Sequence, residues 1–404
     1  MRRIYLDNAA ATPTDRRVVK AMKPYMNKVF GNPSSLHKDG ILAKNVIERA
    51  RESIAQVFSA HKDEIVFTSG GTESNNLAIV GVVNAFRAES NSTPHIVVST
   101  IEHPSVLNTV KALESEGKIS ATYVPVGEDG IVDTSELKKS LRPETILVSV
   151  MYANNEIGTI QPIKEIAKIV RHFRKTKSED STKENKESTY PYLHTDACQA
   201  VNYLDVNVAR LSIDLMTVSG AKIYGPKGVG ALYVKRGTKV SPIIYGGGQE
   251  SGVRPGTENT PAIAGLCEAV VYTEKIKESE NVRLEAVRDY FIGETKKLFP
   301  ECELNGDKHK RLPNNVHISI HGVDSEQLVI ELDAKGVSVS SKSACKSRDE
   351  GISHVLRALS RDDKRSALGG IRFSMGRNTK KKDIDYVLNI LPKIVQRVRN
   401  PISF

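Results

Sequence analysis

Residues 215–228 read Leu215-Met216-Thr217-Val218-Ser219-Gly220-Ala221-Lys222-Ile223-Tyr224-Gly225-Pro226-Lys227-Gly228. The first five residues form an apolar run that predicts a buried strand, and the glycines and the proline after it predict a turn. Lys222 therefore stands just past the end of a strand. An earlier run, Tyr192–Thr195, predicts a second strand, and Asp196 follows it directly. Two strands thus end at a lysine and an aspartate.

The first 260 residues alternate strand-like and helix-like patterns. Residues 38–59 and Asn75–Phe86 have apolar side chains at helical spacing. Further strand-like runs are Glu64–Thr68, His95–Ser99, Thr145–Met151 and Val229–Val234. Strands that alternate with helices predict an α/β fold with a mostly parallel sheet covered by helices.

The pattern changes near residue 260. Gly246–Gly256 has the composition of a loop, and a long helical pattern follows over Pro261–Leu298. Shorter strand and helix patterns fill the remainder. We therefore expect a large α/β domain over 15–260 and a small α+β domain made of 1–14 with 261–404. The stretch 174–189 is almost wholly polar and charged, so it predicts a mobile loop between a helix and a strand.

Composition narrows the class of protein. The 404 residues are 39% hydrophobic and 26% charged, which is typical of a soluble globular chain, and the net charge of +10 comes from scattered basic residues. We expect no direct nucleic-acid binding. No run approaches the roughly 18 apolar residues of a membrane span, and the N-terminus has no signal-like segment, so we expect a cytoplasmic protein without membrane attachment. The four cysteines form no CxxC pair, so we expect reduced thiols and no metal site of the protein's own.

A possible phosphate site lies at residues 69–76, Ser69-Gly70-Gly71-Thr72-Glu73-Ser74-Asn75-Asn76. This segment follows a strand and opens a helix, where free backbone N–H groups and the helix dipole favour an anion. A simple turn is the alternative. Ser219 and Thr257 are further polar candidates for the same group. Together with the amine of Lys222 and the carboxylate of Asp196, the pattern is what pyridoxal 5'-phosphate (PLP) requires: a Schiff-base partner and a carboxylate for the pyridine nitrogen. The alternative for Asp196 is a helix N-cap.

Other strand ends carry polar side chains that would face the same crevice. His103 ends a strand and can stack on a planar ring and move protons, or merely make a local hydrogen bond. Asn155 and Gln199 follow two further strands. Arg372 interrupts an apolar run, which favours a buried pairing with either a substrate carboxylate or an internal acid.

Cys345 is the candidate nucleophile among the four cysteines. Lys342 and Lys346 flank it in a polar stretch, and cationic neighbours favour the reactive thiolate. Cys198 and Cys267 stand among apolar residues, which predicts that they fill the core.

Taken together, these motifs resemble the cysteine desulfurases of the NifS/IscS type, in the class V aminotransferase group of PLP fold-type I enzymes. The resemblance covers nearly the whole chain and rests on these segments: 5–8, 31–35, 68–76, 102–103, 154–158, 196–199, 219–228, 254–259, 340–345 and 372–377. It implies a seven-stranded, mainly parallel sheet and a homodimer.

The resemblance also implies a role for each candidate residue. Lys222 would hold PLP, and His103 would stack on its ring. The remaining cofactor contacts would come from Gly71, Thr72, Asn155, Asp196, Gln199, Ser219 and, across the dimer, Thr257. L-Cysteine would be bound through Asn155 and Arg372, and Cys345 would accept its sulfur as a persulfide, leaving alanine.

One residue departs from the family pattern. Many relatives have a histidine at the position of Ala221, where it donates to the PLP phosphate, so this chain lacks one cofactor contact.

The resemblance implies a protein that accepts the sulfur, either an iron–sulfur scaffold protein or a tRNA-thiolation enzyme. Cys345 would be able to share a cluster transiently with such a scaffold. Two alternatives are a selenocysteine lyase-type activity and a non-catalytic binding or regulatory homologue.

Overall fold

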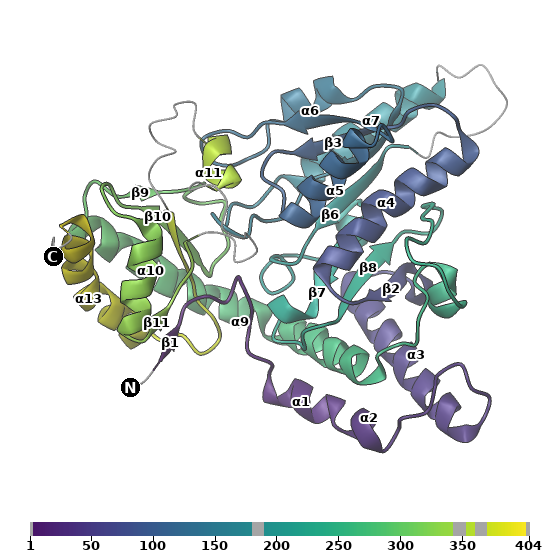
Figure 1. Cartoon of the computed structure of the whole chain (residues 1–404), viewed down its shortest axis with the longest axis horizontal. Helices are drawn as coiled ribbons and strands as arrows, with labels where there is room; N and C mark the ends of the chain where they lie inside the picture. Colours follow the sequence, from purple (N-terminus) through teal and green to yellow (C-terminus); the bar gives the residue numbers. More distant parts are fainter. Residues whose placement is uncertain (1–2, 180–189, 342–352, 360–369, 401–404) are drawn as a thin grey trace.

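A seven-stranded sheet forms the centre of the larger part of the computed structural model (Figure 1). The structure describes residues 3–179, 190–341, 353–359 and 370–400. The strands run in the order β2-β8-β7-β6-β5-β3-β4. Their bounds are β2 Ile65–Thr68, β3 His95–Ser99, β4 Ser120–Val124, β5 Thr145–Ser149, β6 Tyr192–Asp196, β7 Leu215–Ser219 and β8 Gly230–Val234. Only β8 runs antiparallel to its neighbours in this sheet, so the prediction of a mostly parallel sheet is confirmed.

Helices cover both faces of this sheet. Their bounds are α1 Arg16–Met22, α2 Pro24–Asn27, α3 Lys38–Phe58, α4 Gly71–Glu89, α5 Pro104–Ser115, α6 Thr134–Ser140, α7 Ile163–Glu179, α8 Val208–Leu211 and α9 Thr260–Leu298. Successive residues of β3 point to opposite faces, so Val97 joins the apolar cluster under α3 and α7, whereas Ile96 and Val98 join the cluster under α4 and α5. Burial on both faces explains why the central strands read as continuous apolar runs.

The stretch 174–189 was wrongly predicted as a loop from its first residue. Helix α7 continues to Glu179, and residues 180–189 lie outside the described part of the chain. Polar contacts hold this last turn: Arg174 forms an ion pair with the buried Asp214 and donates to the carbonyl of Pro191 at 2.7 Å. Lys177 donates to the carbonyl of Pro143 at 2.6 Å. The prediction considered only apolar contacts and therefore missed these contacts of charged side chains.

The smaller part has its own sheets and its own core. A three-stranded antiparallel sheet has the order β12-β10-β9, and a two-stranded parallel sheet pairs β1 with β11. The bounds are β1 Ile4–Tyr5, β9 Glu303–Leu304, β10 Asn315–Ser319, α10 Ser325–Ala334, β11 Val337–Ser338, β12 Gly370–Ser374 and α13 Lys381–Arg399. Helix α11 His354–Leu359 packs instead against Ile101, Met151 and Ile157 of the larger part. Inside the core of the smaller part the rings of Phe291 and Phe373 meet edge to face, with centroids 4.9 Å apart.

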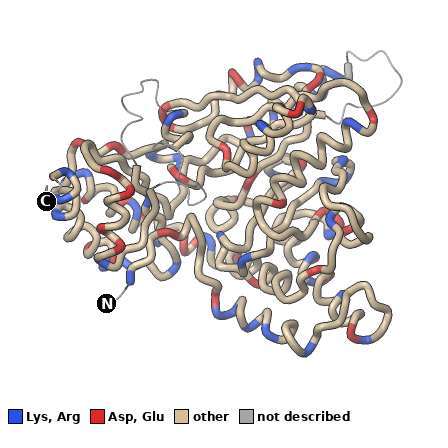
Figure 2. Tube along the Cα trace, in the orientation of Figure 1, with Lys and Arg blue, Asp and Glu red and all other residues tan. Residues whose placement is uncertain are grey.

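Helix α9 connects the two parts. Its first half contributes Leu266 to the core beneath the large sheet, and its second half contributes Leu284 to the core of the smaller part. The division into domains 15–260 and 1–14 with 261–404 stays a prediction, because the first half of α9 packs in the core of the larger part. Figure 2 shows basic and acidic residues interspersed along the trace of both parts. No helix in the described ranges has the length and apolar character to cross a membrane.

Candidate active site

A cavity of about 310 Å³ lies where the parallel strands of the large sheet end. Its volume is within the roughly 300–1,000 Å³ of small-molecule sites. The cavity brings together ten residues singled out in the sequence: Gly71, Thr72, His103, Asn155, Asp196, Gln199, Ser219, Ala221, Lys222 and Arg372. Cys345 lies outside the described residues, and Thr257 does not line the cavity. The cavity is therefore the candidate active site.

Lys222 lies in the short 3₁₀ turn η2 Gly220–Lys222, directly after β7. Its Nζ donates to the carbonyl oxygens of Ala9 and Ala10, at 3.1 Å and 2.5 Å. Gln199 donates to the same carbonyl of Ala9 at 2.9 Å. The segment that follows β1 thus passes over the cavity and holds the lysine amine at its wall.

Asp196 ends β6, with 7% of its surface exposed. Its Oδ1 accepts from the backbone N–H of Cys198 at 2.9 Å within a turn, and no helix begins at this point of the described chain, so the alternative prediction of a helix N-cap is wrong. Its Oδ2 accepts from the amide of Asn75 at 2.7 Å, and this amide also donates to Ser105. The sequence analysis assigned no role to Asn75. The carboxylate is therefore fixed from two directions at the cavity wall.

The start of helix α4 provides the predicted anion site. Gly70 occupies the N-cap position with φ 149°, and no side chain caps the first turn, so its N–H groups remain available to an anion. A Cβ added to Gly71 would lie 2.8 Å from Sγ of Cys198, so a larger residue would crowd this turn. Gly71 and Ser219 line the same end of the cavity, which fits a phosphate group there.

His103 caps helix α5 and also lines the cavity. Its Nδ1 accepts from the backbone N–H of Ser105 at 3.1 Å, which leaves the proton of the neutral ring on Nε2. Burial lowers the pKa of His103, Asp196 opposes this effect, and the charge of Lys222 lowers the pKa further. A neutral imidazole with a defined tautomer therefore stands at the site. The sequence offered a local hydrogen bond and a place at the ligand crevice as alternatives for His103, and the structure shows both.

Arg372 forms one of its two predicted pairings, the one with an internal acid, and its pairing with a substrate carboxylate stays a prediction. Its side chain is 3% exposed and pairs with Asp7 at 2.8 Å, so an internal ion pair exists. It also donates to the carbonyl of Asn155 at 2.9 Å and lines the cavity. Its Nε is buried and has no hydrogen-bond partner within the described residues. The guanidinium therefore retains a donor for a further group.

Described residues on both sides of Cys345 contact residues at the cavity or next to it in the sequence: Arg372 lines the cavity, and Glu102 precedes the cavity residue His103. Ser340, five residues before Cys345, exchanges two backbone hydrogen bonds with Arg372, at 2.7 Å and 3.2 Å. On the other side, Nε2 of His354 lies 2.9 Å from the backbone carbonyl of Glu102.

Glu102 is a buried carboxyl group to which the sequence analysis gave no role. Its Oε1 accepts from Ser99 Oγ at 2.6 Å and from the N–H of Met151 at 2.7 Å, whereas the buried Oε2 has no partner in the described part of the chain. Burial raises its pKa to about 8, with a further contribution from Asp196. At neutral pH the group is therefore a neutral acid that joins the ends of β3 and β5 beside His103.

Cys198 is buried, as the sequence predicts, and it has a second feature that the sequence did not indicate. It lines the cavity behind Gly71, and burial raises its pKa well above the usual value, with Asp196 adding to the effect. It is therefore a neutral thiol within the site. Cys267 packs against the core of the large part, and Cys302 belongs to the core of the smaller part.

The loop that carries Thr257 lies outside the cavity but is joined to it. Thr257 is exposed, while the nearby Arg254 pairs with Glu73 of α4 at 2.7 Å. Glu73 lines the cavity. The predicted contact of Thr257 with a neighbouring copy's phosphate stays a prediction.

Comparisons with known proteins agree with this geometry. The model of the family described as Aminotransferase class-V matches residues 4–387. Cysteine desulfurase IscS from Dictyoglomus turgidum is 45% identical over 398 residues, which cover 98% of this chain and 96% of that protein.

Two solved structures extend the comparison to the fold. One, described as a NifS-like protein, has a TM-score of 0.87 at 33% identity, covering 98% of this chain and 100% of that one. The other, SspA in complex with cysteine, has a TM-score of 0.75 at 34% identity, covering 92% and 98%. The chain therefore belongs to the class-V aminotransferase family, among the NifS- and IscS-type proteins.

Proposed function

We propose that this chain is a PLP-dependent cysteine desulfurase that converts L-cysteine into L-alanine and a persulfide on Cys345. The observation that carries the proposal is a single cavity lined by Lys222, Asp196 and the uncapped start of α4. The relatives named as cysteine desulfurases, and the similar SspA structure with cysteine, support the choice of substrate.

The residues at the cavity fit PLP. The amine of Lys222 would hold the cofactor covalently, the carboxylate of Asp196 would face its ring nitrogen, and the N–H groups of Gly71 and Thr72 would face its phosphate. Gln199, Ser219 and His103 would complete the contacts, His103 by stacking on the ring. When bound, PLP supplies an electron sink at the α-carbon of an amino acid.

The protein side chains supply binding and proton transfer. The guanidinium of Arg372, which lines the cavity, would bind the carboxylate of cysteine, with Asn155 beside it. Lys222 and His103 would move the α-proton, because both line the cavity and the neutral imidazole can accept it. Glu102, as a neutral acid, adds no second negative charge beside Asp196.

Sulfur transfer would be the role of Cys345. Its thiolate would attack the sulfur of bound cysteine, the carbon–sulfur bond would break, and the electron pair of that bond would remain with the carbon, which takes up a proton. The overall reaction is Cys345–SH plus L-cysteine giving Cys345–S–SH plus L-alanine. The contacts of Ser340 with Arg372 and of His354 with Glu102 support this role, because they place described residues before and after Cys345 near the cavity.

The proposed desulfurase activity also suggests which proteins this chain binds. We propose a homodimer in which Thr257 completes the neighbouring site, and a sulfur-acceptor protein that is an iron–sulfur scaffold or a tRNA-thiolation enzyme. A cytoplasmic location remains a prediction.

Reduction with borohydride tests the cofactor assignment. Purified protein should bind PLP with visible absorbance, and reduction should leave the cofactor on the peptide that contains Lys222, as located by mass spectrometry. Lys222→Ala should lose this adduct and all turnover while keeping the melting temperature close to that of the parent. Lys227→Ala is the matched control, since Lys227 donates to the carbonyl of Thr12 at 2.8 Å but does not line the cavity. An adduct on another lysine would overturn the assignment.

A further inference from the structure

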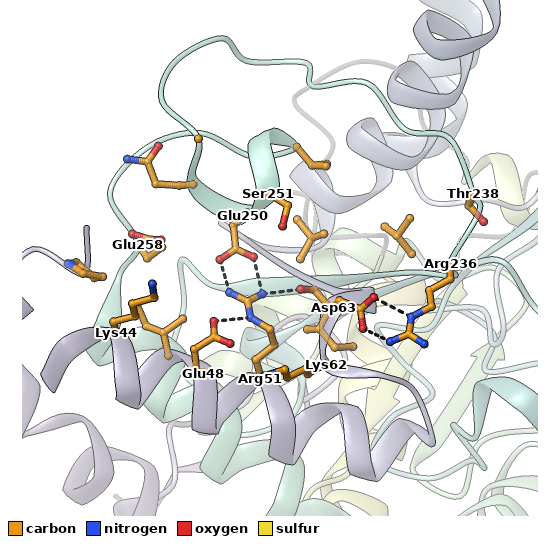
Figure 3. Close-up of a pocket in the computed structure, with 18 of the residues that line it drawn as sticks. Lys44, Glu48, Arg51, Lys62, Asp63, Arg236, Thr238, Glu250, Ser251 and Glu258 are labelled. Atoms are coloured by element: carbon orange, nitrogen blue, oxygen red, sulfur yellow. Dashed lines mark hydrogen bonds and ion pairs between the residues drawn. The ribbon is translucent and has the colours of Figure 1, made fainter. Parts of the chain in front are cut away.

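A cavity of about 800 Å³ lies beside α3, and its lining residues are separate from those of the candidate active site (Figure 3). Charged side chains line it, and several of opposite sign pair with one another. Arg51 of α3 pairs with Glu250, and Arg236 pairs with Asp63. The two pairs differ in burial: the side chains of Arg51 and Glu250 are 11% and 2% exposed, whereas those of Arg236 and Asp63 are 57% and 54% exposed.

The Arg51–Glu250 pair covers the free edge of the large sheet. The pair is bidentate, with two N–O distances of 2.7 Å. Strand β2 is an edge strand, so its outer backbone groups have no neighbouring strand. Arg51 donates to the carbonyl of Ile65 at 2.5 Å, and Glu250 accepts from the N–H of Phe67 at 2.8 Å. The ion pair thus supplies the acceptor and the donor that a further strand would provide.

Glu250 also fixes a strained loop. It lies in the 3₁₀ turn η3 Gln249–Gly252, where Glu250 and Ser251 have φ of 47° and 57°. Consecutive non-glycine residues in the left-handed region are strained and persist only where surrounding contacts hold them. The buried carboxylate of Glu250 supplies such contacts, and Gln249 accepts from the N–H of Gly256 across the loop at 3.1 Å. Breaking the ion pair should therefore release this loop.

The loop is connected to the candidate phosphate site by a second ion pair. Arg254 donates to Oε1 of Glu73 at 2.7 Å, and Oε2 of Glu73 accepts from the N–H of Ser69 at 2.7 Å. Ser69 begins the turn that leads into α4. A second connection runs along the backbone of β2, because Phe67, whose N–H donates to Glu250, is only two residues before Ser69. Two independent connections therefore lead from the Arg51–Glu250 pair to the turn that would hold the phosphate.

We propose that Arg51 and Glu250 are positioning residues for the cofactor phosphate, acting through the edge of β2 and through the Arg254–Glu73 contact. The inference rests on the proposed function, because it requires PLP in the cavity. The pair touches neither cofactor nor substrate. Its effect is to hold residues 69–72 in the conformation that directs backbone N–H groups at the phosphate.

Pyridoxal distinguishes this role from a general loss of structure, because it has the ring and aldehyde of PLP but no phosphate. Apo full-length protein is titrated with PLP and, separately, with pyridoxal. Arg51→Lys keeps the charge but loses the bidentate geometry, and Glu250→Gln keeps an acceptor for Phe67 but loses the charge. We expect both variants to bind PLP at least about tenfold more weakly, with pyridoxal affinity within about twofold of the parent.

Arg236→Lys is the matched control, since it disrupts a bidentate pair in the same cavity that has no connection to residues 69–72. It should leave both affinities unchanged. Parental PLP affinity in the two test variants, or an equal loss for PLP and pyridoxal, would overturn the positioning role. If one variant fails to fold, the other still decides the question. A parental protein that binds neither compound would instead contradict the proposed function itself.

Discussion

Replacing Glu102 by glutamine should remove a large part of the pH dependence of folding. Burial raises the pKa of Glu102 from 4.5 to about 8, so the folded protein keeps a proton that the unfolded chain releases above pH 4.5. The stability contributed by this group is therefore complete below pH 4.5 and is lost as the pH rises to about 8. At about 1.4 kcal/mol per pH unit, the loss over this interval is roughly 5 kcal/mol. Glutamine has a similar shape and no ionisable proton, so the variant should not show this loss.

Urea unfolding of the full chain at several values between about pH 5 and about pH 8 measures the effect as a free energy of unfolding. The parent should lose several kcal/mol more than Glu102→Gln across this range. Glu278→Gln is the control, because Glu278 is exposed on α9 and its replacement should leave the parental pH dependence unchanged. If the curves of Glu102→Gln and the parent run parallel within about 1 kcal/mol, Glu102 is ionised in the folded protein, and our description of the site is wrong.

Three further substitutions test individual contacts in the cavity. Ala221→His should tighten PLP binding by roughly 1.5–3 kcal/mol, because it restores a charge-assisted hydrogen bond to the phosphate; an unchanged dissociation constant would show that the space or the phosphate is already filled. Gly71→Ala should weaken PLP binding, because its Cβ would lie 2.8 Å from Cys198 Sγ, and Cys198→Ala should relieve the loss; absence of relief would place the strain elsewhere. Arg372→Lys should raise KM for cysteine at least about tenfold with a smaller effect on PLP affinity, whereas an unchanged KM would restrict Arg372 to its ion pair with Asp7.

The central features of the site could be predicted because they depend on strand ends. Parallel strands finish at one edge of a sheet, so a lysine after β7 and an aspartate at the end of β6 must lie near each other. The apolar runs that identify these strands are buried on both faces and are therefore easy to detect. Strand β4 was missed because four of its five residues are only partly buried, and its sequence mixes polar and apolar residues.

What the sequence did not indicate depends on contacts between distant residues. Asn75 meets Asp196 across 121 positions, and Glu250 meets Arg51 across 199. No local pattern predicts such pairs. Cys198 looked like a core residue because its neighbours are apolar, yet its Sγ lies close to Gly71, in the turn that we propose for the phosphate. The raised pKa of Glu102 likewise results from complete burial, which a single glutamate in a polar motif does not indicate.

The central claim is that Cys345 accepts the sulfur of cysteine in a site built around Lys222. The most direct test incubates the PLP-loaded protein with sulfur-labelled L-cysteine for a single turnover, locates the label by mass spectrometry, and measures the alanine released. We predict one labelled sulfur on Cys345 for each alanine, and neither product from Cys345→Ser, which should still bind PLP and cysteine. Label on Cys198, Cys267 or Cys302, or alanine production by Cys345→Ser at the parental rate, would contradict the account and favour a lyase that needs no thiol nucleophile.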